Sequence, residues 1–118
     1  MTDKTISIPI YDFFIRVLIA DTLEEFEEVV FDAGYEESVK TAGAIVFNNP
    51  YHTKSFVVAF NKDDISVGNI AHEALHVTNR VLEDVGVVFR ADEDEPHAYL
   101  LGFLVDCLHK IIDDEDRN

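Results

Sequence analysis

Apolar positions in the first part of the chain cluster and alternate as they do in β-strands. Residues 5–20, TISIPIYDFFIRVLIA, are rich in β-branched and aromatic side chains, which pack well on a pleated surface. They predict one long strand, or two short strands broken near Pro9 and Asp12. Two further apolar runs, at 43–48 and 55–60, also predict strands. The turn-like segment NPYHTK joins these two runs, so an antiparallel hairpin is expected there.

A helix is expected directly after the first extended region. Thr22 and Glu25 have the spacing of a capping box, in which two side chains satisfy free backbone N–H groups at the start of a helix. Gly34 is typical of the residue that ends a helix. The apolar side chains between these signals share one face, opposite the acidic ones: Leu23, Phe26, Val29 and Val30.

Two longer helices are expected in the second half of the chain. Ser66 is a good N-cap for a helix over about 67–85 that stops at Gly86. Its apolar residues recur at helical spacing: Ile70, Ala74, Val77, Val81 and Val85. The segment VGVVFR that follows predicts a short extended piece between the two helices.

The last helix is expected over about 97–112, after Pro96, which suits a first turn. The sequence HAYLLGFLVDCLHKII is apolar around most of a helix circumference. This helix is therefore expected to be central to the core. Cys107, in its second half, is expected to be a buried small hydrophobe.

The order strand, helix, two strands, helix, helix predicts an α+β fold. We expect a small, mainly antiparallel sheet packed by about three helices. A chain of 118 residues is the size of one domain, so 1–118 is expected to fold as a single unit.

Charge limits the partners that this chain can have. Twenty-four acidic residues oppose nine basic ones, for a formal net charge of −15. A phosphate backbone and an anionic membrane surface would both be repelled. Direct nucleic-acid binding and membrane binding are therefore not expected, whereas metal ions, basic protein surfaces and neutral peptides remain. The oligomeric state does not follow from the sequence.

Sequence features that bear on the compartment agree with one another. The single cysteine excludes an intramolecular disulfide. The start of the chain, MTDKTISIPI, lacks the basic residues and long apolar run of a signal peptide. Apolar stretches are too short to span a membrane. The expected location is a reducing cytoplasm, which would be that of a host cell if the protein is viral.

The segment HEALH, residues 72–76, carries the candidate chemistry. On a helix, His72 and His76 lie on one face one turn apart, so both imidazoles can reach one ion at about 2.0–2.1 Å. Glu73 lies about 100° round the helix, where it can reach a water on that ion but is poorly placed as a ligand. The segment thus offers two ligands and a general base. The competing explanation is a helix that carries two histidines and no ion.

A catalytic zinc site usually has three protein ligands and one open position. Glu95 is the predicted third ligand, because a helix packed against the motif helix can present its first turn to the ion. His97 is the alternative, and two residues that lie two apart on a helix point in nearly opposite directions. Acidic residues also favour helix N-termini without any ion. The candidates come from one stretch of the chain: Asp92, Glu93, Asp94, Glu95 and His97.

HEALH followed by the acid-headed segment EPHAYLLGFL resembles the zinc metallopeptidases of the gluzincin type, in which HExxH precedes a ligand glutamate on a following helix. The compact size is similar to that of minimal gluzincins, of ImmA/IrrE-like proteases and of small HExxH proteins encoded by tailed phages. The resemblance covers about residues 55–108. Many gluzincins have an aspartate four residues after the ligand glutamate. Tyr99 stands at that position here, so the residue that orients a ligand histidine is unassigned.

The resemblance implies a minimal zincin-like fold with HExxH on the central helix, and the activity of a zinc-dependent peptidase. His72, His76 and Glu95 would hold Zn²⁺, which lowers the pKa of its bound water towards neutrality. Glu73 would take the proton as the water attacks a peptide carbonyl, and would then pass it to the leaving amine. The substrate would be a peptide or protein.

Supporting roles can be assigned on the same resemblance. Tyr99 would donate a further hydrogen bond in catalysis, and His97 is the other candidate for that role, although packing or surface exposure explains either residue more simply. The strand at 55–60 would hold an extended substrate by adding a strand to the sheet, or it is a plain core strand.

Two functions other than a peptidase stay open at this stage. The chain can be a non-enzymatic acidic protein that mimics DNA or masks a basic surface, in which case Glu73→Gln has no effect. It can also bind zinc as a structural domain without activity. A structural site would need a fourth protein ligand, such as His97 or Asp92.

Overall fold

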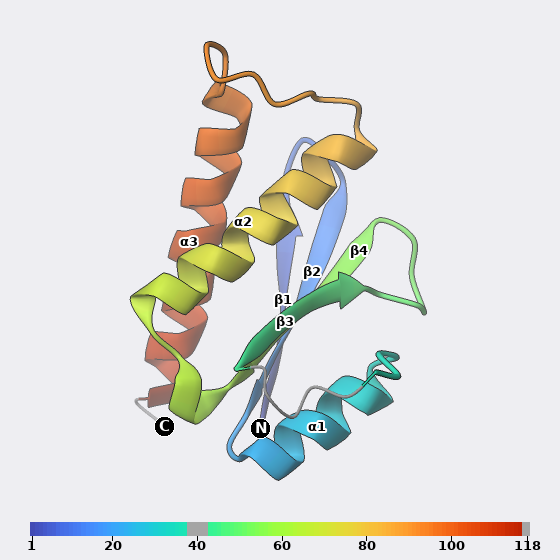
Figure 1. Cartoon of the computed structure of the whole chain (residues 1–118), viewed down its shortest axis with the longest axis vertical. Helices are drawn as coiled ribbons and strands as arrows, with labels where there is room; N and C mark the ends of the chain where they lie inside the picture. The colour runs from blue at the N-terminus through green and yellow to red at the C-terminus, as the bar shows by residue number, and fades with distance from the viewer. Residues whose placement is uncertain (38–42, 117–118) are drawn as a thin grey trace.

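Four strands form one mixed sheet in the order β1-β2-β4-β3 (Figure 1). The computed structural model describes residues 1–37 and 43–116. The strands are β1 (Thr2–Ile8), β2 (Phe13–Ala20), β3 (Ala44–Asn48) and β4 (Ser55–Asn61). β1 and β3 pair antiparallel with β2 and β4, respectively, whereas β2 and β4 run parallel. The expected hairpin and the two-strand form of the first extended region are confirmed.

The break between β1 and β2 is a tight turn around Pro9. Proline lacks a backbone N–H and so cannot donate to the strand ladder. Ile10 and Asp12 then take positive φ angles of 71° and 58°, which reverse the chain within a few residues. The sequence signals near Pro9 and Asp12 therefore marked the correct place.

β4 lies inside the sheet, with β2 on one side and β3 on the other. All seven of its residues are buried. Both of its backbone edges are occupied, so β4 has no free edge on which a peptide could add as a strand. The suggestion that residues 55–60 hold an extended substrate is therefore wrong, and the core-strand explanation holds. The free edge on that side belongs to β3.

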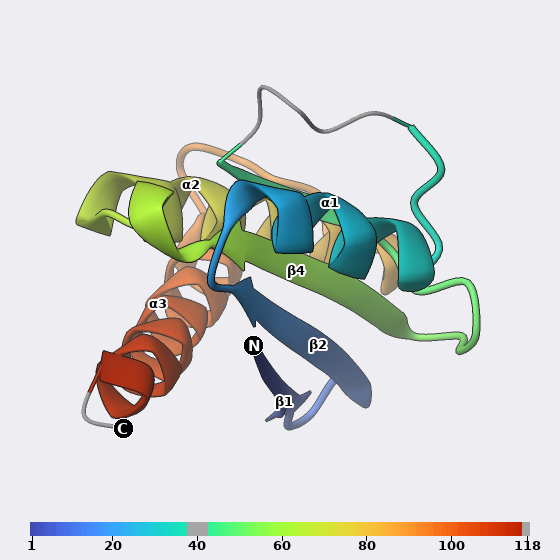
Figure 2. The same ribbon diagram turned by 90° about the horizontal axis from the view of Figure 1, so that it is seen from below.

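The sheet separates two apolar cores (Figure 2). The helices are α1 (Leu23–Asp32), α2 (Val67–Asp84) and α3 (Glu95–Asp116), with a short 3₁₀ turn at Lys62–Asp64. Because side chains alternate across a strand, Leu18 and Val57 pack with α1 whereas Val17 and Val58 pack with α2 and α3. The α+β fold with three helices on a small sheet is confirmed.

Helix ends follow the local signals of the sequence. The hydroxyl of Thr22 accepts a hydrogen bond from the Glu25 N–H at 3.1 Å, and Ser66 accepts one from the Asn69 N–H at 3.1 Å. Gly34 and Gly86 follow α1 and α2 with φ angles of 110° and 80°, which only glycine adopts without strain. Both caps and both stops are as predicted.

α3 differs from its prediction in length and in burial. It begins at Glu95 and extends to Asp116. Its buried residues form a single stripe at intervals of three or four: His97, Leu100, Leu104, Leu108 and Ile112. The helix thus contributes one stripe to the larger core and exposes much of its remaining surface, whereas burial around most of its circumference was expected. Residues 85–90 form no strand.

The described part of the chain contains no helix that is both long enough and apolar enough to cross a membrane.

Candidate functional site

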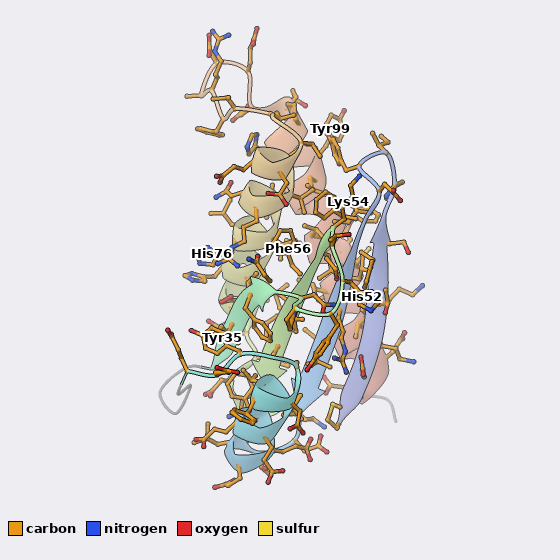
Figure 3. The ribbon with its side chains drawn as sticks, turned by 90° about the vertical axis from the view of Figure 1, so that its right-hand side faces the viewer. Tyr35, His52, Lys54, Phe56, His76 and Tyr99 are labelled. Atoms are coloured by element: carbon orange, nitrogen blue, oxygen red, sulfur yellow. The ribbon has the colours of Figure 1, made fainter. Side chains whose placement is uncertain are left out.

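The motif HEALH lies in the first half of α2. His72 and His76 are on the exposed side of the helix, and His76 projects away from the body of the molecule (Figure 3). Glu73 belongs instead to the buried stripe of α2, together with Ile70, Ala74 and Val77. The helix places these groups at the border between its exposed face and its buried face.

The two imidazoles converge. Their Nε2 atoms are 3.2 Å apart, and the rings meet edge to face with centroids 4.8 Å apart. Two nitrogens bound at about 2.0–2.1 Å to one tetrahedral ion lie about 3.3 Å from each other. The separation therefore fits two ligands of one zinc ion. It also fits a hydrogen bond between two neutral imidazoles, one donating and one accepting.

Glu73 is a buried acidic residue with an unsatisfied carboxyl oxygen among the described residues. The residue is 5% exposed, and its Oε2 makes no hydrogen bond within the described residues. Burial raises the pKa of Glu73 above the ordinary carboxyl value, and the nearby His72, His76 and Arg80 oppose this shift. A carboxylate in such surroundings is a better proton acceptor than an exposed one, as a general base requires.

The structure does not bring a third predicted ligand to the histidine pair. Glu95 is exposed and lines a groove formed with the β1–β2 turn. Within residues 1–37 and 43–116, no group of three or more His, Cys, Asp or Glu side chains is arranged to hold a metal ion. His72 and His76 are thus assembled, whereas Glu95 is placed elsewhere.

His97 lies on the inner side of α3, near the second half of α2. It is 8% exposed, its Nδ1 has no hydrogen-bond partner in the described residues, and its ring meets that of Phe89 edge to face at 5.1 Å. It lines a cavity of about 640 Å³ with Leu75 and Asn79. The burial of His97 and its contact with Phe89 support the explanation that this residue packs in the fold and does not act in catalysis.

Tyr99 is 76% exposed and lines the same groove as Glu95. No hydrogen bond or ring contact in the described residues joins it to HEALH. The surface explanation fits Tyr99, because a role in catalysis requires contact with the reacting groups.

Sequence reasoning missed two neighbours of the motif. α2 contacts β3, which is an edge strand of the sheet formed by the described residues, so a strand edge lies beside the motif helix. Arg80 lies one turn after His76 and acts electrostatically on Glu73. The spacing of four residues from His76 was visible in the sequence, whereas the position of β3 depends on the strand order.

Comparisons with protein-family models, with curated proteins and with solved structures found no match.

Proposed function

We propose that this protein is a zinc-dependent peptidase whose site is built on His72, Glu73 and His76. The observation that carries the proposal is the 3.2 Å separation of the two Nε2 atoms near the buried Oε2 of Glu73, which has no hydrogen-bond partner among the described residues. Convergent imidazoles suit a zinc ion, and an adjacent carboxylate with a raised pKa suits proton transfer. A bound zinc ion would supply Lewis-acid activation of a water molecule and of the peptide carbonyl.

The residues of the chain have separate tasks in this proposal. His72 and His76 hold the ion through Nε2. The free Oε2 of Glu73 accepts a proton from the attacking water and returns it to the leaving amine. Its burial between Ile70 and Val77 limits competition from bulk water.

An extended substrate would bind along β3. Among residues 1–37 and 43–116, this strand pairs with β4 alone, and it contacts α2. The unpaired N–H and C=O groups of an edge strand can hydrogen-bond an added peptide strand. Such a peptide would run alongside β3 and next to α2, so its backbone would lie near HEALH.

The third ligand is a separate question within the proposal. His72 and His76 are sufficient for a weak site whose other positions are taken by water and substrate. Glu95 becomes a ligand only if the start of α3 moves towards α2. Glu95→Ala tests this directly: unchanged zinc affinity means that the described arrangement holds, and weaker binding means that α3 closes on the ion.

The test of function is hydrolysis of fluorescein-labelled casein by the purified protein with added zinc. We expect zinc-dependent release of fluorescent peptides that chelation stops. Glu73→Gln should still bind zinc but should lose turnover, because the amide cannot accept the proton. Equal hydrolysis by wild type and Glu73→Gln would overturn the proposal. Zinc binding without hydrolysis would indicate that the ion has a structural role and no catalytic one.

A further inference from the structure

A second surface, far from HEALH in sequence order, is both apolar and open. The β1–β2 turn and the first turns of α3 enclose a groove of about 460 Å³. Figure 3 shows Tyr99 at the end of the molecule where this turn lies. Its walls are mostly apolar: Ile8, Pro9, Ile10, Tyr11, Pro96, Tyr99, Leu100 and Phe103, with Glu95 as the charged member.

Apolar side chains at this groove extend into solvent. Ile10 is 94% exposed, Tyr99 76% and Phe103 37%. Single exposed apolar residues are common, but three that line one groove form a contiguous patch of the kind found at interaction sites. Nothing in the fold of the described residues requires Ile10 to be apolar, because it contributes to neither core.

The backbone at Ile10 is strained as well. Ile10 has a φ of 71°, and the Tyr11 N–H donates to the Pro9 carbonyl oxygen at 2.8 Å. A hydrogen bond between residues two apart around a positive φ is the rare, strained form of the γ-turn. A β-branched residue is particularly unfavourable there. Glycine would relieve this strain, so an exposed isoleucine costs stability without any visible structural return.

Charge indicates the chemistry of the partner. The chain has a formal net charge of −15. Glu95 lies in the groove, and Asp12 and Asp94 are exposed at its two borders, in the turn and just before α3. A second copy of this chain would be repelled, whereas a cationic segment would be attracted.

We infer that this groove, with Ile10 as its anchor, docks a basic segment of another protein that carries apolar side chains. The apolar groups of the segment fill the groove between Ile10 and Tyr99, and its lysine or arginine side chains face Glu95 and the acidic borders. Apolar grooves in proteins can receive one face of an amphipathic peptide. This inference is independent of the proposed peptidase, and its test uses no metal.

The probe is a short fluorescein-labelled peptide of leucine and lysine at helical spacing, followed by fluorescence anisotropy. Wild type should bind it saturably, and a peptide with glutamate in place of lysine should not bind. Ile10→Gly and Tyr99→Ser should each raise the Kd about tenfold or more, as truncation of a central anchor does. Phe31→Ser is the matched control, because Phe31 is 62% exposed on α1 and does not line the groove.

Thermal unfolding separates docking from folding. Ile10→Gly should unfold at the same or a higher temperature than wild type, because it removes strain while it removes the anchor. Weaker binding by a variant that is no less stable would support the groove. Equal binding by wild type, Ile10→Gly and Tyr99→Ser would show that only net charge attracts the peptide, and would overturn the inference. An absence of saturable binding would overturn it too.

Discussion

The Nε2 atoms of His72 and His76 lie 3.2 Å apart on the exposed side of α2. The spacing of four residues places the rings one above the other, but it does not by itself point both Nε2 atoms to one place. The convergence is compatible with a shared proton and with a shared metal ion. Among the described residues, the buried Oε2 of the adjacent Glu73 has no hydrogen-bond partner. The proposed metal site would give this carboxyl group a role as general base, whereas a shared proton would not.

Burial along α3 predicts opposite outcomes for two neighbouring residues. Leu104 is 1% exposed and Phe103 37%. Leu104→Ala should lower the free energy of unfolding by about 2–5 kcal/mol, because it leaves a cavity in the core. Phe103→Ala should cost about 1 kcal/mol or less, since a half-exposed ring loses few contacts. Urea denaturation of both variants measures the difference; equal losses would mean that α3 is buried all round after all.

The two glycines with positive φ at the ends of α1 and α2 form a matched pair. A Cβ on Gly34 would overlap the ring of Pro50, whereas a Cβ on Gly86 would meet open space. Gly86→Ala should therefore cost only the left-handed strain, about 1 kcal/mol. Gly34→Ala should cost about 2–4 kcal/mol, because a steric overlap is added to the strain. Thermal or chemical unfolding gives both values, and a smaller loss at Gly34 than at Gly86 would contradict the packing described.

The cap of the motif helix should matter measurably. Ser66→Ala removes the acceptor for the Asn69 N–H and should lower stability by about 1 kcal/mol. Thr22→Ala removes the equivalent bond at α1 and should cost a similar amount. Only Ser66→Ala should also weaken zinc binding, because fraying of α2 would disturb His72 first. Equal zinc affinity in both variants would show that zinc binding does not depend on the Ser66 cap.

Cys107 should react slowly with alkylating reagents. Cys107 is only partly buried, and not fully buried as expected. This partial burial, followed by the charge of Asp106, raises the pKa of its thiol above the ordinary value of 9.0, with Lys110 opposing. The folded state thus favours the protonated thiol. The contribution of the Cys107 thiol to the free energy of unfolding is fully present below its pKa in the unfolded chain. It is lost as the pH rises through its higher pKa in the folded protein.

The measurement for Cys107 is the rate of reaction with iodoacetamide against pH. In the folded protein the midpoint should lie above 9.0, and in urea it should fall to the ordinary thiol value. A midpoint in the folded protein at or below the value in urea would show that Cys107 is not shielded.

Local features of the fold were predictable from the sequence, and non-local ones were not. The caps at Thr22 and Ser66 and the break near Pro9 depend on residues within one turn, so the sequence marks them correctly. The placement of β4 inside the sheet depends on which strand pairs with β2, and that choice is decided by the packing of both cores. The apolar run at 55–60 is compatible with either position.

The candidate site shows the same division. The position of His72 and His76 on one face of α2, one turn apart, follows from helical periodicity and was predicted. The burial of Glu73 without a partner depends on the neighbours that the sheet supplies. The distance from Glu95 to the motif depends on where α3 begins and how it crosses α2, and HEALH contains no information on either.

The central claim is that His72 and His76 hold a zinc ion. Its most direct test is elemental analysis of the protein after equilibrium dialysis against a fixed zinc concentration, with the dialysis buffer as the reference, beside His76→Ala and a control variant, His109→Ala, on the exposed side of α3. We expect about one zinc ion per chain in wild type and in His109→Ala, and its loss in His76→Ala. No zinc in wild type, or equal zinc in all three proteins, would contradict the claim and leave the two histidines as a hydrogen-bonded pair on a helix surface.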